Sequence, residues 1–291
     1  MENSTTEIFG ENMSSIKFTI IPPNKALSRD VECFRIAEHG GKQGLAIKVC
    51  PNGFPGIVFQ HSNGRPAIEN IITNSGRVLH MPDTLFVYGQ VTELSVMNFK
   101  QEPYVTVQAI LKPHALKTLF GMDASRLTNN SMSYSEFNGE VFNERMLSAK
   151  SYQEYISLFE NFLQEMLREH QSRDILVEES LKYIQLNIST ITVKELLENV
   201  YLSERQFEKR FIQAVGISPQ FYIRVKRFNE AMKRIDSGQY ERLCDVAHSL
   251  NYFDQSHLIR DIKVFSGITP KSISQKVNEL HHDLIGTSYL S

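Results

Sequence analysis

Two stretches of the chain place arginine, glutamine and lysine side chains at helical spacing, on what would be the outer face of a capped helix. They read LSERQFEKRFIQAVGISP at residues 202–219 and FDQSHLIRDIKVFSGITP at residues 253–270. Arginine and glutamine form paired hydrogen bonds with guanine and adenine edges, and an exposed isoleucine can contact a thymine methyl group. These stretches therefore supply candidates for reading DNA bases. The candidates are Arg205, Gln206, Glu208, Lys209, Gln255, Ser256, His257, Ile259 and Arg260.

Four further residues are candidates for contacts with the phosphate backbone, which position a protein on DNA without specifying sequence. They are Ser203, Arg227, Lys263 and Thr269, two cations and two hydroxyl residues at helix starts. Ser256 is an equally good phosphate candidate. Residues 204–276 hold 13 Lys and Arg against 8 Asp and Glu, whereas the whole chain has a net charge of −2. Positive charge is therefore concentrated where phosphate binding would need it.

The two stretches repeat one pattern of helix signals at an offset of 51 residues. Ser203 and Asp254 can each accept a hydrogen bond from the first turn of a helix, and Gln206 completes a capping box with Ser203. Gly216 and Gly267 supply the residue most easily placed in the left-handed conformation that ends a helix. Each stretch therefore predicts one helix with a defined start and end.

A shorter amphipathic helix is predicted before each capped helix, and Thr192 with Glu195 forms a capping box for the first of them. Helix, tight turn and helix is the helix-turn-helix plan, whose second helix can enter the major groove of DNA. Apolar residues spaced by four and three from Phe221 to Ile235 predict a long helix that packs against both units. A plain helical bundle with a charged surface is the alternative, but duplication in register favours DNA binding.

This arrangement resembles the DNA-binding domain of the AraC/XylS family of bacterial transcription regulators. The second copy, DVAHSLNYFDQSHLIRDIKVFSGITP, carries the resemblance most clearly. The resemblance implies that the two capped helices enter successive major-groove segments on one face of the duplex. It places Arg205, Glu208 and Lys209 at DNA-contacting positions of the first helix. It places five residues at those of the second, namely Gln255, Ser256, His257, Ile259 and Arg260.

The chain departs from the family pattern at several positions. Tyr201 and Asn251 stand where the family has a turn glycine, although asparagine tolerates a left-handed backbone. Lys209 stands where arginine is common, and lysine cannot form the two parallel hydrogen bonds of a guanidinium group. Glu208 and Asp261 add negative charge beside the expected groove. We therefore expect the first unit to be a weaker base reader than the second.

Short segments bounded by turn residues predict strands through the first half of the chain, and the residues of 45–49 and 105–111 alternate with the period of two of half-buried strands. The segments are Phe18–Ile21, Val31–Ile36, Leu45–Val49, Gly56–Gln60, Thr84–Val91 and Tyr104–Leu111. Short strands in series indicate a small sandwich or barrel. The predicted fold class is therefore α+β multidomain. A β-rich, cupin-like or sandwich-type N-terminal domain precedes an all-α domain of two helix-turn-helix units joined by a long helix.

We expect a flexible tail at 1–15, a β-rich sensing or dimerisation domain at 16–170, an AraC-type DNA-binding domain at 171–280 and an exposed C-terminal tail at 281–291. The first domain should end in an amphipathic helix from Tyr152 to Arg168. Its wide apolar face can pack on its own barrel or pair with the same helix of a second chain. The width of the face favours pairing.

The first half also resembles the barrel-type domain that precedes the DNA-binding domain in AraC-family regulators of the Bacteroidetes type. The segments CPNGFPGIVFQ and FVYGQVT carry this looser resemblance. It implies a domain that senses a small-molecule effector, forms a homodimer, or does both. We therefore expect a sequence-specific, AraC-type activator of transcription that binds double-stranded promoter DNA and contacts RNA polymerase.

No metal or cofactor site and no catalytic set is predicted. The histidines of the first half, His39, His61, His80 and His114, lack the spacing of metal ligands. Phosphate-loop, nucleophile-elbow and Cys-x-x-Cys motifs are missing from the sequence. Tyr88, Phe86, Phe59 and His61 could line a barrel interior, although aromatic residues on strands more often pack as core. We expect a protein that is not an enzyme.

Composition favours a cytoplasmic protein without a membrane span. Hydrophobic residues make up 41% and charged residues 22% of the chain, and no apolar run approaches the ~20 residues of a membrane helix. Three widely spaced cysteines fit reduced thiols. Two alternatives stay open: a ligand-binding or enzymatic barrel whose helical domain contacts proteins, and a family member that acts by heterodimerisation without DNA binding.

Overall fold

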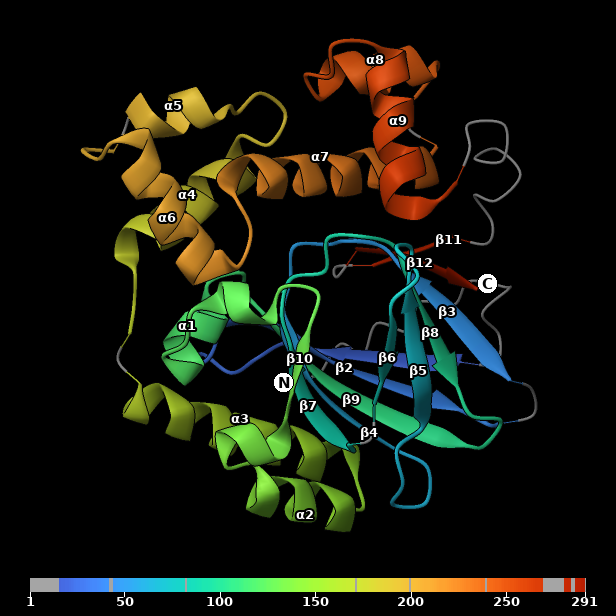
Figure 1. The fold of residues 1–291 in the computed structure, drawn as a ribbon. Helices are drawn as coiled ribbons and strands as arrows, with labels where there is room; N and C mark the ends of the chain where they lie inside the picture. The colour runs from blue at the N-terminus through green and yellow to red at the C-terminus, as the bar shows by residue number, and fades with distance from the viewer. Residues whose placement is uncertain are drawn as a thin grey trace.

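The computed structural model describes residues 16–41, 44–81, 83–170, 172–198, 200–238, 240–268, 280–283 and 286–290, the last two ranges by their backbone alone. A β-rich domain with helices on one side lies below a domain of helices, and the two domains are in contact (Figure 1). This is the predicted order of a β-rich part followed by an all-α part. Within the described residues, no helix combines the length and the apolar character needed to cross a membrane.

Two antiparallel sheets of six strands form the β-rich domain. The first has the order β1-β2-β9-β4-β7-β10 and the second β11-β12-β3-β8-β5-β6. The bounds in the first sheet are β1 Ile16–Ile21, β2 Val31–His39, β9 Tyr104–Leu111, β4 Gly56–His61, β7 Leu85–Tyr88 and β10 Ser131–Ser133. Those in the second are β11 Leu280–Asp283, β12 Gly286–Leu290, β3 Leu45–Val49, β8 Ser95–Phe99, β5 Ile68–Thr73 and β6 Val78–His80.

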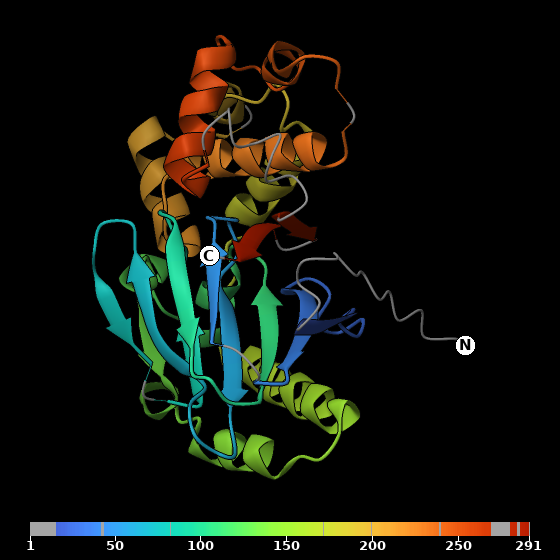
Figure 2. The same ribbon diagram turned by 90° about the vertical axis from the view of Figure 1, so that its right-hand side faces the viewer.

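Alternation along the strands gives the first sheet two different faces. On β2, Phe34 and Ile36 join the core under the helices, whereas Arg35 and Ala37 point into a cavity shared with the second sheet. The arrangement is a sandwich with a hollow centre. The two sheets line the cavity. Helices cover the outer face of the first sheet (Figure 2).

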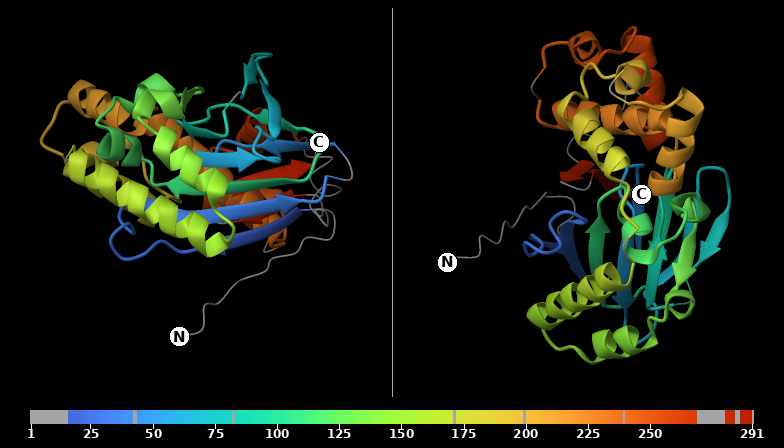
Figure 3. Two further views of the ribbon diagram at one scale, coloured as in Figure 1. Left: turned by 90° about the horizontal axis from the view of Figure 1, so that it is seen from below. Right: turned by 90° about the vertical axis from the view of Figure 1, so that its left-hand side faces the viewer.

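The covering helices are those that follow the last long strand. They are α1 Ala115–Phe120, the short 3-10 helices η2 Ala124–Leu127 and η3 Tyr134–Phe137, α2 Glu140–Ser148 and α3 Tyr152–Glu169. Seen from below, α2 and α3 lie across the strands (Figure 3). The Phe159 ring of α3 lies 6.0 Å from Phe34 on the sheet, and Phe162 stacks on Phe142 of α2 at 4.3 Å.

The apolar stripe of α3 is therefore occupied within its own domain, which corrects the expectation that it pairs with a second chain. Its width is explained by two neighbours, because Tyr155, Ile156 and Phe159 join the same buried cluster as the sheet and α2. A helix between a sheet and another helix needs a wider apolar face than a helix with one neighbour.

The second domain holds six helices within the described residues. They are α4 Ile175–Leu186, α5 Val193–Glu198, α6 Glu204–Val215, α7 Pro219–Asp236, α8 Leu243–Ser249 and α9 Gln255–Ser266. The predicted long helix is α7, and it serves both units as expected. Tyr222 and Ile223 pack in the core of the first unit, whereas Phe228 and Met232 pack in that of the second.

The expected C-terminal tail is instead part of the second sheet. β11 and β12 pair with each other, and β12 pairs with β3, where Ser288 lies opposite Val49. Both strands also lie against α7. The pairing has a physical reason: without β12, β3 would expose a row of unpaired backbone groups at a sheet edge. The chain thus returns from the helical domain to the β-rich domain.

Candidate nucleic-acid interface

The first unit consists of α5, a turn and α6. Helix α6 starts with the capping box that the sequence predicts. The Ser203 hydroxyl accepts a hydrogen bond from the Gln206 amide at 3.4 Å, and the Gln206 side chain accepts one from the Ser203 amide at 3.1 Å. Gly216 ends the helix with a φ of +99°. Four base-reading candidates, Arg205, Gln206, Glu208 and Lys209, are exposed along α6.

The second unit consists of α8, a turn and α9. Asp254 caps α9 by accepting a hydrogen bond from the His257 amide at 2.7 Å, and Gly267 ends the helix with a φ of +68°. Asn251, the residue in place of the turn glycine, has a φ of +56° as its tolerance for that conformation predicts. The candidates Gln255, Ser256, Arg260 and Lys263 are exposed, and His257 and Ile259 are half-buried.

His257 has a second packing partner that limits its freedom. Its ring lies edge-on against Tyr252 with 5.2 Å between centroids. Tyr252 is buried in the core of the second unit. The imidazole is therefore held in place at the start of α9 rather than free to adapt.

The two capped helices lie on either side of a cleft of about 430 Å³ whose wall includes α7. In Figure 1, α7 runs crosswise between α6 and α9, and both of these helices point with their C-terminal ends toward the β-rich domain. The helices α6, α7 and α9 contribute polar side chains to the cleft. These side chains are Glu204, Glu208, Gln220, Arg224, Arg227, His257 and Asp261.

Asp261 does not add free negative charge beside the groove, contrary to expectation. It is only 1% exposed, and its Oδ1 atom accepts hydrogen bonds from Nε and Nη2 of Arg224 at 2.9 and 2.7 Å. The Arg224 guanidinium also lies over the Phe265 ring at 4.9 Å. The pair therefore fixes α9 against α7, because a buried carboxylate needs a hydrogen-bonded cation.

Arg227, a candidate phosphate contact, is engaged by the backbone of its own domain. Its Nε atom donates to the Ile188 carbonyl at 3.2 Å, and Nη2 donates to the Ile191 carbonyl. Burial lowers the pKa of the guanidinium below its ordinary value. The side chain thus holds the loop between α4 and α5. Of the other phosphate candidates, Ser203 is used as the α6 cap, Lys263 is exposed and Thr269 lies outside the described residues.

The β-rich domain covers the C-terminal end of α6. The Thr128 hydroxyl donates to the Gly216 carbonyl at 2.7 Å, and α6 contacts both α1 and η2. Ile212 and Gln213 of α6 are half-buried. The exposed reading face of α6 is therefore limited to its first two turns.

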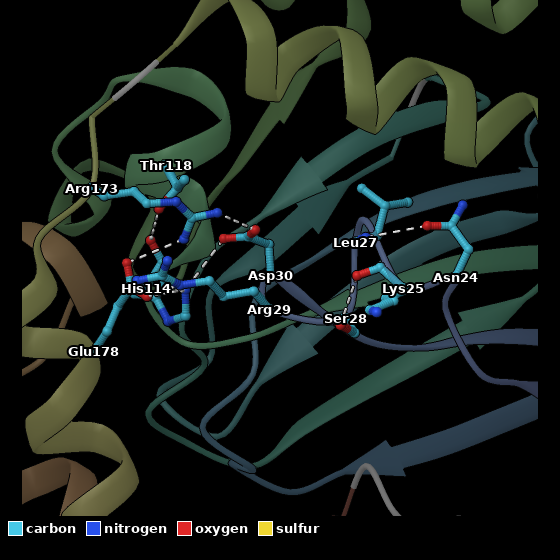
Figure 4. A network of polar contacts seen from close by, with 10 residues as sticks. All are labelled: Asn24, Lys25, Leu27, Ser28, Arg29, Asp30, His114, Thr118, Arg173 and Glu178. Carbon is cyan, nitrogen blue, oxygen red and sulfur yellow. Dashed lines mark hydrogen bonds and ion pairs between the residues drawn. The ribbon is translucent and has the colours of Figure 1, made fainter.

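A buried charge cluster joins the domains at the connection before α4 (Figure 4). Asp30 lies at the start of β2 and is fully buried, and Glu178 of α4 is 3% exposed. Arg173 reaches both, with Nη2 at 2.5 Å from Asp30 Oδ2 and Nη1 at 3.2 Å from Glu178 Oε1. Arg29 Nε also lies 2.7 Å from Glu178 Oε2, and His114 Nε2 lies 3.3 Å from Asp30 Oδ1.

The cluster compensates the burial of its carboxylates. Burial alone would raise the pKa of Asp30, but hydrogen bonds and charge from His114 and Arg173 outweigh it, so that the net pKa lies below the ordinary value. Next to the cluster, Asp174 caps α4 and accepts hydrogen bonds from Arg210 of α6 at 2.9 and 3.0 Å. The linker is thereby tied to both domains.

A second contact between the domains lies along α7. Asn229 donates to the Pro51 carbonyl at 2.8 Å, and the Lys226 ammonium lies 4.3 Å from the centre of the Phe54 ring. Burial lowers the pKa of Lys226 to about 8. Lys226 thus lies under the loop between β3 and β4.

Residues 196–276 match the family described as a helix-turn-helix domain, and residues 19–133 match a domain of unknown function, DUF6597. No curated protein sequence matches the chain. Among solved structures, ToxT from Vibrio cholerae O395 is similar with 11% identity and a TM-score of 0.45, covering 84% of this chain and 96% of its own. The AraC-like transcriptional activator CuxR is similar with 13% identity and a TM-score of 0.21, covering 77% of this chain and 80% of its own.

The matched family and the two capped units define the class of the C-terminal part. It is an AraC-type helix-turn-helix DNA-binding domain. A domain of this class supports a DNA-binding transcriptional regulator. The N-terminal part is a sandwich of two antiparallel sheets that carries the DUF6597 domain.

Proposed function

We propose that this protein is a sequence-specific activator of transcription whose DNA binding responds to a signal received by the β-rich domain. The observation that supports sequence reading is the pair of capped helices, each exposing an arginine among amide or hydroxyl side chains. Arg205 lies on α6, and Arg260 lies on α9. Such side chains discriminate bases in the major groove.

Both units would engage one duplex at once. Two recognition helices that enter successive major-groove segments read sites about one helical turn apart, roughly 10 bp. The Arg224–Asp261 pair supports this reading, because it fixes α9 on the helix α7 that also carries the first unit. Arg205, Gln206, Glu208 and Lys209 would read one block, and Gln255, Ser256, His257, Ile259 and Arg260 the other. Lys263 would contact phosphate.

The response to a signal is supported by the way the β-rich domain holds α6. The contact at Gly216 attaches the first unit to the β-rich domain, and the contact at Asp174 attaches it to the linker. A ligand that shifts these contacts would change the placement of the first unit relative to the second. A ligand shifts an equilibrium only by its differential affinity for the two placements. Homodimerisation and contact with RNA polymerase belong to the same proposal through the resemblance to the AraC/XylS family.

The proposal is tested by incubating the full chain with random duplexes at two salt concentrations and sequencing the retained DNA. We expect enrichment of two sequence blocks about a helical turn apart. Salt-sensitive retention without enrichment would mean a charged surface that does not read bases. No retention at either salt concentration would favour the alternative in which the helical domain contacts proteins.

Arg260→Ala identifies the second block. The substitution should cost ~1–3 kcal/mol of binding to the selected site and relax the sequence preference in one block alone. Arg205→Ala should act on the other block by a similar or smaller amount. Arg65→Ala, an exposed arginine of the β-rich domain, is the control. Affinity that is unchanged in a titration of the Arg260 variant would remove α9 from the base-reading elements.

A further inference from the structure

The sandwich encloses a cavity of about 170 Å³ between its two sheets. The side chains that point inward from both sheets form its wall. The apolar ones include Phe18, Val58, Phe86, Met97 and Phe99. Apolar walls with a few polar groups are typical of small-molecule sites.

The size of the cavity restricts the ligand. An apolar cavity of about 150 Å³ engineered in another protein holds one benzene molecule. A space of about 170 Å³ therefore fits a body of one aromatic ring or a short branched alkyl group. A long acyl chain is larger than this space and would extend beyond it. The parallel stack of Phe99 on Tyr104, at 4.4 Å, provides a flat wall for such a body.

One end of the cavity is polar and cationic. Arg35 lies on β2 directly opposite Gln108 of β9, and both side chains line the cavity. The Arg35 guanidinium lies 4.5 Å from the centre of the Phe18 ring. Among the lining residues that the structure describes, Arg35 is the one with an ionised side chain. Guanidinium groups bind carboxylates through two parallel hydrogen bonds.

Tyr88 adds a neutral hydrogen-bond donor to the wall, within the electrostatic influence of Arg35. The Tyr88 hydroxyl is enclosed, and burial raises the pKa of Tyr88 far above its ordinary value. The phenol therefore keeps its proton at any physiological pH and can donate it to an acceptor. The Gln108 amide adds a further donor beside Arg35. A carboxylate that leaves water needs such partners, since an unpaired buried charge is very costly.

We propose that this cavity binds a small carboxylic acid with a body of about one aromatic ring, its carboxylate at Arg35 and its apolar body between the sheets. The inference rests on the proposed signal-receiving role of the domain and names the chemical class of the signal.

The cavity wall continues directly into the contacts with the helical domain. Cys50 and Asn52 line the cavity, and the carbonyl of Pro51 between them accepts the hydrogen bond from Asn229 of α7. On another side, Asn129 lines the cavity next to Thr128, which donates to Gly216 at the end of α6. A ligand bound in the cavity can therefore shift residues that directly adjoin the contacts with α6 and α7.

The test is calorimetric titration of the full chain, without DNA, with benzoate, phenylacetate and 3-methylbutanoate. Toluene is the uncharged match, and palmitate is the long-chain acid. We expect at least one of the three small acids to bind at least tenfold more tightly than toluene and palmitate. Equal binding of toluene would overturn the acidic head group, tighter binding of palmitate would overturn the size limit, and no binding by any small acid would overturn the site.

Two variants place the ligand in the cavity. Arg35→Met should weaken binding of the acid at least tenfold, whereas the control Arg65→Met, on the exposed turn before β5, should leave it unchanged. Val58→Phe, which fills the cavity from β4, should weaken binding while leaving Arg35 intact. Thermal unfolding of each variant shows whether it is folded. Unchanged affinity in both folded variants would move the site elsewhere. Failure here would leave the DNA selection result untouched, because the titration contains no DNA and the selection contains no acid.

Discussion

At the scale of single residues, the cations of the helical domain fall into two groups with different roles. Arg205, Lys209 and Arg260 are exposed on the capped helices and available to DNA. Arg224 and Arg227 lie on α7, and each is engaged in holding elements together. Hydrogen bonds of a buried guanidinium stabilise the fold because losing one partner leaves the other unsatisfied.

Arg227→Ala should lower the free energy of unfolding by ~1–3 kcal/mol, because the carbonyls of Ile188 and Ile191 lose their donor. The slope of DNA affinity against salt should stay unchanged. Chemical denaturation and a salt titration measure the two quantities. Lys233→Ala, an exposed residue of the same helix, is the control. A flatter salt slope with unchanged stability would return Arg227 to the phosphate contacts.

At the scale of elements, α7 is the axis on which the two units and the sandwich meet. Its apolar stripe supports both helix-turn-helix units, and its remaining side carries Lys226 and Asn229 to the loop before β4. The β11–β12 hairpin lies against the same helix and extends the second sheet. The helix is thus covered on more sides than an isolated DNA-binding domain would need.

Lys226 gives the contact along α7 a pH dependence. In the folded protein its pKa is about 8, whereas an unfolded lysine has its ordinary value near 10.5. The unfolded state therefore binds more protons between about pH 8 and 10.5, so the contribution of Lys226 to stability rises with pH across that window. The contribution of Lys226 to the free energy of unfolding is most unfavourable below pH 8 and is no longer unfavourable above about pH 10.5.

Lys226→Met should consequently stabilise the protein at pH 7 by about 1–3 kcal/mol, allowing for partial solvent access to the side chain. The advantage over the wild type should shrink between pH 8 and 10.5. Denaturant unfolding of both proteins at pH 7, 9 and 10 measures the difference, in which other titrating groups cancel. A difference independent of pH would show that the lysine is not held as described.

Removal of residues 280–291 should expose the edge of β3, because β12 pairs with it over Ile47–Val49. An unpaired edge promotes association with other chains. We expect a lower midpoint of thermal unfolding and concentration-dependent self-association in sedimentation experiments. Unchanged behaviour in both experiments would mean that the hairpin contributes nothing to the sheet in solution.

At the scale of the whole molecule, the charge cluster at Asp30 makes the two domains one unit. Its carboxylates come from both domains, and Arg173 of the linker joins them. Breaking one side of a buried ion pair costs about 3–5 kcal/mol, because the other charge is left uncompensated. The cluster therefore holds the domains in this arrangement only as a complete set.

Arg173→Met should loosen the contact between the domains while each keeps its core. We expect a larger radius of gyration in solution scattering and faster proteolysis between α3 and α4. Adding Asp30→Asn should restore part of the compactness, because it removes a carboxylate that Arg173 neutralised. Arg168→Met, on the exposed end of α3, is the control. An unchanged radius and cleavage rate would assign the contact to α6 and α7 alone.

Local signals in the sequence account for the helical domain. Caps at Ser203 and Asp254 and stops at Gly216 and Gly267 act within one turn, so the bounds of α6 and α9 follow from neighbouring residues. The same locality explains the exposed base-reading candidates. Strands with clear alternation, such as β3 and β9, were predictable for the same reason, whereas β5, β8, α2 and α4 carry weaker patterns and were not predicted.

Tertiary structure alone decided which charged side chains are buried and where the strands β11 and β12 pair. Arg227, Lys226 and Asp261 look alike in sequence to exposed residues, and only the packing of distant segments buries them. The pairing of β12 with β3 joins residues nearly the whole chain apart, for which no local pattern exists. The cavity likewise arises from two sheets meeting face to face. The sequence by itself determined the reading helices, because helix signals are local, and the fold decided how they are held, because burial and pairing are not.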